Sequence, residues 1–325
     1  MADMKALVTG GAGYIGSHLV DRLLRDGHRV TILDDLSVGK LAHIEGHRSN
    51  PLFRFLEGSI LDKSLVQEAL RGCDLVFHLA AMVGIRYIVD DPLWGMMVNV
   101  RGTEIVLEEA AEAGCPFILA SSSEVYGKNA KIPFSEEGDR TLGPTWVARW
   151  SYSTAKALDE HLALAYHAQR GLLVTILRYF NSYGPRLDPR GYGSVVAKFI
   201  TQALRGEPLT VHGDGQQTRS FTYIDDTVEG TVLAAEKKEA RGQVFNIGRR
   251  EETTILRLAQ MVKDIVLSPS EIVFVPHSQV YGREFEDTPR RVPDTAKAER
   301  ILGFKAKVSL PEGLPRTIDW FRSRA

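Results

Sequence analysis

Near its start the chain reads Leu7-Val8-Thr9-Gly10-Gly11-Ala12-Gly13-Tyr14-Ile15-Gly16, a glycine-rich turn that follows a short apolar run. The residues before the turn, Lys5–Thr9, predict a buried β-strand. After it, apolar side chains recur with the spacing of a helix, at Ile15, Leu19, Leu23 and Leu24. Glycines at such a turn permit a tight bend and let the backbone approach a pyrophosphate, which the helix N-terminus attracts. The sequence therefore predicts a dinucleotide site at this turn.

The second predicted strand indicates which dinucleotide binds. Arg29–Leu33 ends in Asp34, at the distance where an acidic side chain meets the ribose hydroxyls of adenosine. Asp34 and Asp35 would repel a 2′-phosphate, and no arginine follows at once to receive one. We therefore expect NAD rather than NADP. The structural alternative is a glycine turn beside a solvated pair of aspartates.

The composition argues against several classes of protein. The chain has 40 basic and 41 acidic residues without a basic stripe, which argues against a nucleic-acid partner. Its two cysteines, Cys73 and Cys115, lie in apolar contexts and predict buried thiols in a reducing compartment. No signal peptide and no membrane-spanning run is visible. We expect a cytoplasmic protein that has no membrane partner.

At 325 residues the chain is long enough for one large domain or two. Strand-like runs occur at 5–9, 29–33, 52–56, 75–79, 116–121 and 172–177. Helical patterns fall between most of them, notably Trp94–Ala113 and Ser151–Gln169. This alternation predicts an α/β fold with a doubly wound parallel sheet of the Rossmann type. We expect residues 1–182 to form the NAD-binding domain, able to take back elements from the second half, and 183–325 to form a smaller mixed α/β lobe that binds substrate.

A second constellation is Tyr152-Ser153-Thr154-Ala155-Lys156. On a helix, Tyr152 and Lys156 share a face, and a nearby ammonium lowers the pKa of a phenol toward that of a general base. In Ser121-Ser122-Ser123-Glu124, a serine hydroxyl can hydrogen-bond the reacting oxygen. Exposed Tyr–Lys pairs and serine helix caps are common, so neither motif by itself indicates an active site. Both become evidence for one because they follow the predicted dinucleotide-binding turn.

Together these motifs resemble the extended short-chain dehydrogenase/reductases, and more narrowly their nucleotide-sugar epimerases, dehydratases and decarboxylases. The resemblance runs from Lys5 to about Trp320. Further motifs that carry it are Phe77-His78-Leu79-Ala80-Ala81, Asn99, Ser121-Ser122-Ser123-Glu124-Val125-Tyr126-Gly127 and Arg178-Tyr179-Phe180-Asn181.

The resemblance implies a cofactor site made of the glycine turn, the strand ends and the Tyr–Lys pair. Its expected members are Gly10, Gly13, Tyr14, Ile15, Gly16, Asp34, Ser59, Ile60, Leu79, Ala80, Ala81, Asn99, Tyr152, Lys156 and Tyr179. Ser59 departs from the pattern, because the family usually has aspartate there beside the adenine.

The resemblance also implies a nucleotide-sugar site, with uridine as the family's usual base. Asn181 and Arg219 would meet the diphosphate, and Arg291 would be a second substrate-contacting arginine, since guanidinium forks suit phosphate oxygens. Arg86 is a further candidate near the sugar. The alternative for Arg219 and Arg291 is a role in surface ion pairs. No metal site is expected.

Several reactions share a first step, in which Tyr152 takes the proton of the sugar 4-OH and the C4 hydride passes to NAD⁺. Dehydration is disfavoured, because Ser123 stands where dehydratases carry an acidic aspartate. Resemblance to UDP-glucuronate decarboxylases is seen in Ser122-Ser123-Glu124, Arg149-Trp150-Ser151-Tyr152, Thr254-Ile255-Leu256 and Arg291-Val292-Pro293-Asp294. In contrast, the loop 81–87 lacks their usual proline and, like 99–103, is closer to UDP-glucose 4-epimerases.

On balance the sequence favours an NAD-dependent UDP-sugar 4-epimerase, with a UDP-glucuronic acid decarboxylase as the alternative. The expected catalytic residues are Ser122, Ser123, Glu124, Tyr152 and Lys156. In the decarboxylase, Glu124 and Arg291 would manage the sugar carboxylate. A non-catalytic NAD-binding protein is disfavoured, because such proteins usually lack the tyrosine or the lysine. The helical patterns 94–113 and 151–169 resemble those that pair in family homodimers, although their apolar faces could equally serve the core.

Overall fold

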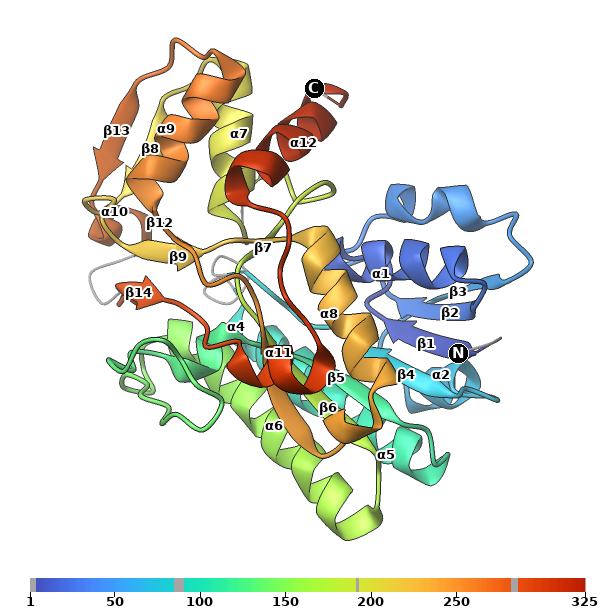
Figure 1. The fold of residues 1–325 in the computed structure, drawn as a ribbon. Helices are drawn as coiled ribbons and strands as arrows, with labels where there is room; N and C mark the ends of the chain where they lie inside the picture. The colour runs from blue at the N-terminus through green and yellow to red at the C-terminus, as the bar shows by residue number, and fades with distance from the viewer. Residues whose placement is uncertain (1–3, 85–90, 191–192, 282–285, 325) are drawn as a thin grey trace.

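The computed structural model describes residues 4–84, 91–190, 193–281 and 286–324. Within these ranges, seven parallel strands form the central sheet, in the order β11-β6-β5-β4-β1-β2-β3 (Figure 1). Their bounds are β1 Lys5–Thr9, β2 Arg29–Asp34, β3 Phe53–Glu57, β4 Leu75–His78, β5 Phe117–Ser122, β6 Val174–Tyr179 and β11 Gln243–Ile247. Strand order reverses between β1 and β4, so a ligand site is expected at the carboxyl ends of these strands. The predicted doubly wound sheet is confirmed.

Helices cover both faces of this sheet. One core joins it to α1 (Tyr14–Arg25) and α8 (Ile224–Glu236). The other core joins it to α2 (Lys63–Ala69), α5 (Thr103–Glu112) and α6 (Arg149–Arg170). Neighbouring residues of β1 alternate between the two, with Val8 in the first core and Leu7 in the second. Because β1 is buried on both faces, its middle residues Ala6, Leu7 and Val8 form a continuous apolar run that the sequence reveals.

The predicted helical stretch Trp94–Ala113 is interrupted in the structure. It consists of α4 (Pro92–Met96), a π-helical segment η3 (Met97–Gly102) and then α5. A π turn widens the helix locally and often occurs at functional sites. Here it contains Asn99, whose side chain bonds both the N–H and the C=O of Met82, at 2.7 and 3.1 Å. The interruption therefore places Asn99 where it holds the backbone of Met82, shortly after the end of β4.

The second half contributes to two regions. Its strand β11 pairs with β6 at the edge of the main sheet. The remainder of the lobe contains α7 (Val195–Arg205), α9 (Ile255–Val266), α10 (His277–Tyr281) and α12 (Leu310–Arg322), whereas α11 (Ala296–Leu302) packs against β11 and α8. Its small sheets are β8 (Leu209–His212) with β13 (Ile272–Val275), β7 (Ser182–Tyr183) with β10 (Thr222–Tyr223), and β9 (Thr218–Ser220) between β12 (Glu252–Thr254) and β14 (Arg290–Arg291). The domain boundary at residue 182 stays a prediction.

Short 3₁₀ helices connect several of these elements. They are η1 (Leu41–His43), η2 (Glu45–His47), η4 (Ser123–Tyr126) and η5 (Lys238–Ala240). The segment η4 matters most for the site, because it begins directly after β5 and carries Ser123 and Glu124.

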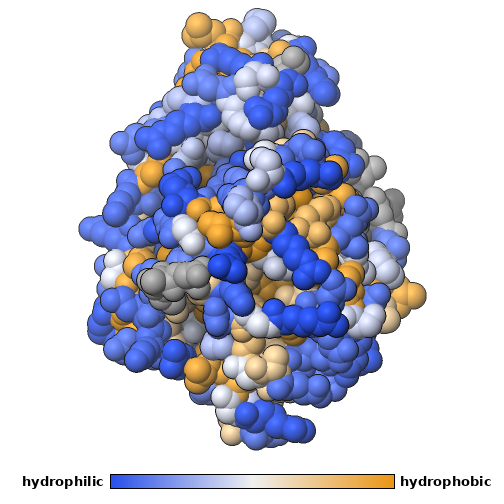
Figure 2. All heavy atoms as spheres, turned by 90° about the vertical axis from the view of Figure 1, so that its right-hand side faces the viewer, coloured by the Kyte–Doolittle hydropathy of each residue, from blue (hydrophilic) through white to orange (hydrophobic). Residues whose placement is uncertain are grey.

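The surface is mainly polar on the face shown in Figure 2, where hydrophobic side chains form separate patches among hydrophilic ones. In the part of the chain that the structure describes, no helix combines the length and the apolar character needed to cross a membrane.

Candidate active site

A cleft of about 540 Å³ follows the carboxyl ends of the central strands and continues into the C-terminal lobe. It brings together most of the predicted cofactor residues. Those that line it are Gly10, Gly13, Tyr14, Ile15, Gly16, Asp34, Ile60, Leu79, Ala80, Ala81, Tyr152, Lys156 and Tyr179. Ser122, Ser123, Glu124, Asn181, Arg219 and Arg291 line the same cleft. One continuous space can therefore hold a dinucleotide beside a second ligand.

The glycine turn fits a closely approaching backbone. A Cβ atom on Gly16 would lie 2.1 Å from the carbonyl oxygen of Gly10. Gly10 itself has a φ of +70°, and a Cβ there would lie 2.7 Å from the backbone nitrogen of Ala80. Helix α1 starts after Gly13, so its first N–H groups and its positive dipole end lie at the cleft. This cradle suits the pyrophosphate of NAD.

Asp34 ends β2 at the cleft. Its buried carboxylate accepts hydrogen bonds from the backbone nitrogens of Ala12 and Leu36, both at 2.9 Å. These bonds join the end of β2 to the glycine turn. The predicted contact of Asp34 with the adenosine ribose stays a prediction.

Two of the predicted site residues do not line the cleft, and the structure does not describe a third. Ser59 does not line the cleft, although Gly58 and Ile60 do, and its hydroxyl accepts a 3.3 Å hydrogen bond from the N–H of Leu61. Asn99 is buried behind the cleft and acts on it through Met82. Arg86 lies outside the described residues.

Tyr152 and Lys156 project from α6 beside Ser122, the last residue of β5. Burial, and then the charge of Glu124, raise the pKa of Tyr152 well above its ordinary value, although a hydrogen bond with Ser122 opposes them. The expected lowering of this pKa by Lys156 is not found. The Lys156 ammonium lies 3.2 Å from Oδ2 of Asp159, and the charge of Asp159 raises the pKa of Tyr152 further. Burial raises the pKa of Asp159 to about 6, against the effect of Lys156.

A cluster of buried and partly buried charged side chains occupies the substrate side of the cleft. Nη1 of Arg291 lies 2.8 Å from Oε1 of Glu124. Nη2 of Arg219 lies 2.9 Å from Oδ1 of Asp287. Burial would raise the pKa of Glu124, but the charges of Arg291, Arg149 and Arg219 hold it below its ordinary value. The two predicted substrate arginines are thus brought together, each paired with a carboxylate of the chain.

Comparison with known proteins identifies the family. Residues 6–248 match the model of the NAD dependent epimerase/dehydratase family. The chain belongs to this family. NAD is accordingly its cofactor, as predicted.

Individual family members differ in the reaction they carry out. The chain is 44% identical, over 98% of both proteins, to the UDP-N-acetyl-α-D-glucosaminuronate decarboxylase of Bacillus cytotoxicus. It also resembles the crystal structure of UDP-glucose 4-epimerase from Thermotoga maritima with UDP-glucose, with a TM-score of 0.89, 36% identity and 99% of both chains covered. It is also similar to the crystal structure of UDP-glucuronic acid 4-epimerase from Bacillus cereus in complex with UDP-glucuronic acid and NAD. The TM-score is 0.88 and the identity is 34%, with 99% of this chain and 100% of the other covered.

Several residues that line the cleft were not predicted as site residues from the sequence. Arg149 belongs to a motif that resembles the decarboxylases, and it stands three residues before Tyr152 and so on the same side of α6. That helical spacing could have marked it. Asp287 also lines the cleft, but no local pattern marks it, because it reaches the site through the fold. Lys198, His212 and His277 line the part of the cleft formed by the C-terminal lobe.

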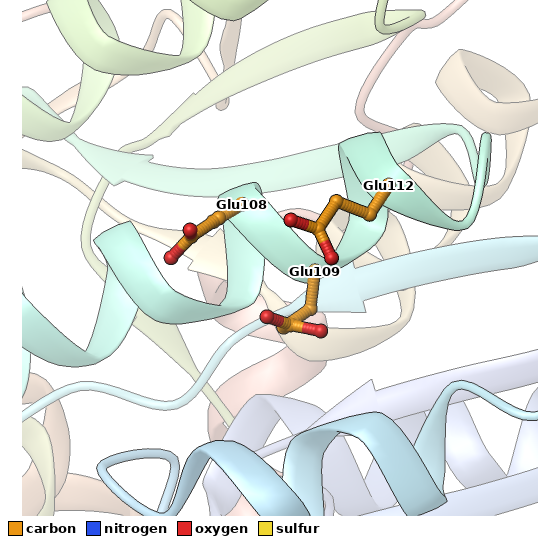
Figure 3. A group of neighbouring side chains, drawn as sticks. All are labelled: Glu108, Glu109 and Glu112. Atoms are coloured by element: carbon orange, nitrogen blue, oxygen red, sulfur yellow. The ribbon is translucent and has the colours of Figure 1, made fainter.

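One group of acidic residues lies away from this cleft. Among the described residues, Glu108, Glu109 and Glu112 have carboxylates close enough together to hold a metal ion. Figure 3 shows that all three project from α5. The Lys63 ammonium lies 2.8 Å from Glu109 and 3.4 Å from Glu108 and already offsets their charge. None of the three lines the cleft, so we assign them no part in its chemistry.

Proposed function

We propose that this enzyme decarboxylates a UDP-linked hexuronic acid, with the 2-acetamido form as the first candidate. The observation that carries the proposal is the ion pair of the partly buried Glu124 with the buried Arg291, which stands beside Tyr152 and Ser122 in the cleft. The high identity to a UDP-N-acetyl-α-D-glucosaminuronate decarboxylase over nearly the full length of both chains supports it. These findings favour the decarboxylase alternative over the 4-epimerase that the sequence favoured.

The proposed reaction begins at C4 of the sugar. When bound, NAD⁺ accepts the C4 hydride and later returns it, which makes a transient 4-ketone possible. Tyr152 takes the proton of the 4-hydroxyl, and Ser122 hydrogen-bonds the same oxygen. Lys156 lies one turn further along α6, where it lines the cleft with Tyr152 and its ammonium pairs with Asp159.

The C6 carboxylate leaves once C4 is a ketone, because the ketone accepts the electron pair of the breaking C5–C6 bond. Carbon dioxide departs and leaves the electron pair in an enolate, and C5 then takes a proton from water before the returned hydride reduces the ketone. Arg291 is the cation that would hold the sugar carboxylate, and the 2.8 Å ion pair with Glu124 fixes its guanidinium. The surrounding arginines keep Glu124 ionised at neutral pH, since its pKa lies below the ordinary value.

A 4-epimerase is the second candidate. Two observations favour it: the likeness to two solved 4-epimerases, and the loop 81–87, which lacks the proline usual in decarboxylases. Tyr152 and Ser122 would serve this reaction equally well, because it shares the oxidation at C4.

The free thiols of Cys73 and Cys115 fit the cytoplasmic location that we also propose.

The deciding experiment offers the purified enzyme and NAD three substrates: UDP-glucuronic acid, its 2-acetamido analogue and UDP-glucose. Proton NMR follows the anomeric signals, and release of labelled carbon dioxide from C6 is counted. A UDP-linked pentose with carbon dioxide supports the proposal, and the faster of the two acids identifies the substrate. A galacto-configured product without carbon dioxide would instead establish the epimerase.

A further inference from the structure

Five charged side chains form a continuous row of ion pairs across the substrate side of the cleft, in which positive and negative charges alternate. In order they are Arg291, Glu124, Arg149, Asp287 and Arg219. Glu124 meets Nη1 of Arg291 at 2.8 Å and Nη2 of Arg149 at 3.4 Å. Asp287 meets Nη1 of Arg149 at 3.3 Å and Nη2 of Arg219 at 2.9 Å. Arg149 is 4% exposed, so the link between the two carboxylates is well shielded from water.

The side chains at the two ends of this row of ion pairs already have roles in the proposed function. Arg219 is the expected partner of the substrate diphosphate. Arg291, fixed by Glu124, is the proposed partner of the sugar carboxylate. The proposed function assigns no role to the two side chains in the middle of this row, Arg149 and Asp287. Interactions between charges are strong in such a shielded place, so a change at one end is felt at the next pair.

Arg219 must exchange a partner when a diphosphate arrives. Its Nη1 atom donates to the carbonyl oxygens of Thr218 and Thr288, both at 2.8 Å, and these bonds fix the guanidinium plane. Its Nη2 atom donates to both oxygens of Asp287, at 2.9 and 3.1 Å. An incoming phosphate therefore competes with the Asp287 carboxylate for this guanidinium edge.

We propose that Asp287 and Arg149 are positioning residues that couple binding of the substrate diphosphate to Glu124. The proposal rests on the proposed function. When a diphosphate accepts the hydrogen bonds of Nη2 of Arg219, the Asp287 carboxylate loses this partner and keeps Arg149 as its remaining arginine. Arg149 moves toward Asp287 and loosens its contact with Glu124, which then faces the sugar with Arg291 as its main partner. The site thus reaches its reactive arrangement only when the nucleotide is in place, as in other population shifts driven by a ligand.

Binding measurements test the exchange at Arg219. Isothermal calorimetry is carried out on the NAD-loaded enzyme with UDP and with uridine, which has no phosphate. We expect Asp287→Asn to bind UDP roughly tenfold more tightly, within the usual range of coupling between sites, and uridine with unchanged affinity. The matched control is Glu286→Gln, the neighbouring carboxylate, which pairs with Lys128 and Trp150 instead. The control should leave both affinities unchanged.

Turnover then separates coupling from a simple structural effect. We expect Asp287→Asn to lose about 10²-fold in kcat while it gains affinity for UDP, because a misplaced group at the reacting centre has effects of this size. Arg149→Met should lose kcat and bind UDP more weakly, since Asp287 then turns wholly to Arg219. Arg149→Lys should restore part of both. The Arg149 variants also test the proposal independently should Asp287→Asn fail to fold.

The possible outcomes are distinct. Weaker UDP binding by Asp287→Asn, or equal tightening by Glu286→Gln, would overturn the exchange, as would an unchanged kcat in Asp287→Asn. If the wild-type enzyme releases no carbon dioxide from either acid, the proposed function fails, and the UDP measurements still decide the exchange. If it does release carbon dioxide while UDP binding is unaltered in Asp287→Asn, the coupling fails and the function stands.

Discussion

Tyr152 is the single side chain on which all proposed chemistry depends, because it takes the proton of the 4-hydroxyl. We expect Tyr152→Phe to lower kcat by about 10²–10⁴-fold, the usual contribution of a positioned proton-transfer group. Its melting temperature should change little, since only the hydroxyl is removed. The matched control is Tyr166→Phe, further along α6 and outside the cleft, which should retain full activity. Near-normal turnover by Tyr152→Phe would refute the assignment.

Glu124 distinguishes the two candidate reactions. In a decarboxylase, Glu124→Gln should reduce carbon dioxide release severely, because the amide no longer supplies the charge that fixes Arg291. A 4-epimerase does not need this charge and would tolerate the change. The pKa of Glu124 lies below its ordinary value, so the stability gained from its ion pairs is present above the unfolded-state pKa. That stability is lost as the pH falls through the lowered folded-state pKa, and acid unfolding of wild type and Glu124→Gln measures the difference.

The turn between β1 and α1 has no room for a side chain at Gly16. We expect Gly16→Ala to abolish measurable NAD binding, because its Cβ would collide with the carbonyl oxygen of Gly10 and move the phosphate cradle. Gly46→Ala is the control, since a Cβ there meets nothing within 4 Å. Fluorescence titration with NADH measures both. A Gly16→Ala protein that binds the cofactor normally would show that the cradle is not where the phosphates lie.

Strand β6 and helix α6 are joined by a buried ion pair. Arg178 donates to both carboxylate oxygens of Glu160, at 2.9 and 2.6 Å, and both side chains are 7% exposed. Removing the charge of Glu160 leaves a buried guanidinium without an opposite charge beside it, so Glu160→Gln should lower the free energy of unfolding by about 3–5 kcal/mol. The exposed pair of Arg101 and Glu104 is the contrast, because Arg101→Ala should change it by less than about 1 kcal/mol. Urea unfolding measures both, and equal effects would contradict the argument.

The protein as a unit is expected to form a homodimer through the helices next to the cleft. Large apolar side chains are exposed at Leu93, Trp94 and Met97, and at Leu158 of α6, which α4 contacts. Burying them against a second copy would remove apolar surface from water. We expect the wild type to sediment as a dimer and the double variant Met97→Glu with Leu158→Glu as a monomer. Leu267→Glu, in the C-terminal lobe, should remain dimeric. A monomeric wild type would contradict the prediction.

The central fold could be predicted closely from the chain. The six predicted strands lie within about two residues of the observed ones, because strands buried on both faces are apolar runs bounded by turns. Strand β11 was not predicted. It is paired with β6, which lies far earlier in the chain, and such a pairing depends on the path of the whole second half.

Local spacing explains which parts of the site the amino-acid sequence revealed. The glycine turn, Asp34 and the Tyr152–Lys156 pair are short patterns whose chemistry follows from adjacent residues, and the cleft brings them together. Ser59 and Asn99 do not line the cleft, because the loop after β3 and the π-helical segment η3 decide where these side chains point, and their roles at the cofactor stay predictions. The ion pairs among Arg149, Asp287 and Arg219 join residues up to 138 positions apart. Their strength depends on distance and on exclusion of water, and folding alone creates both.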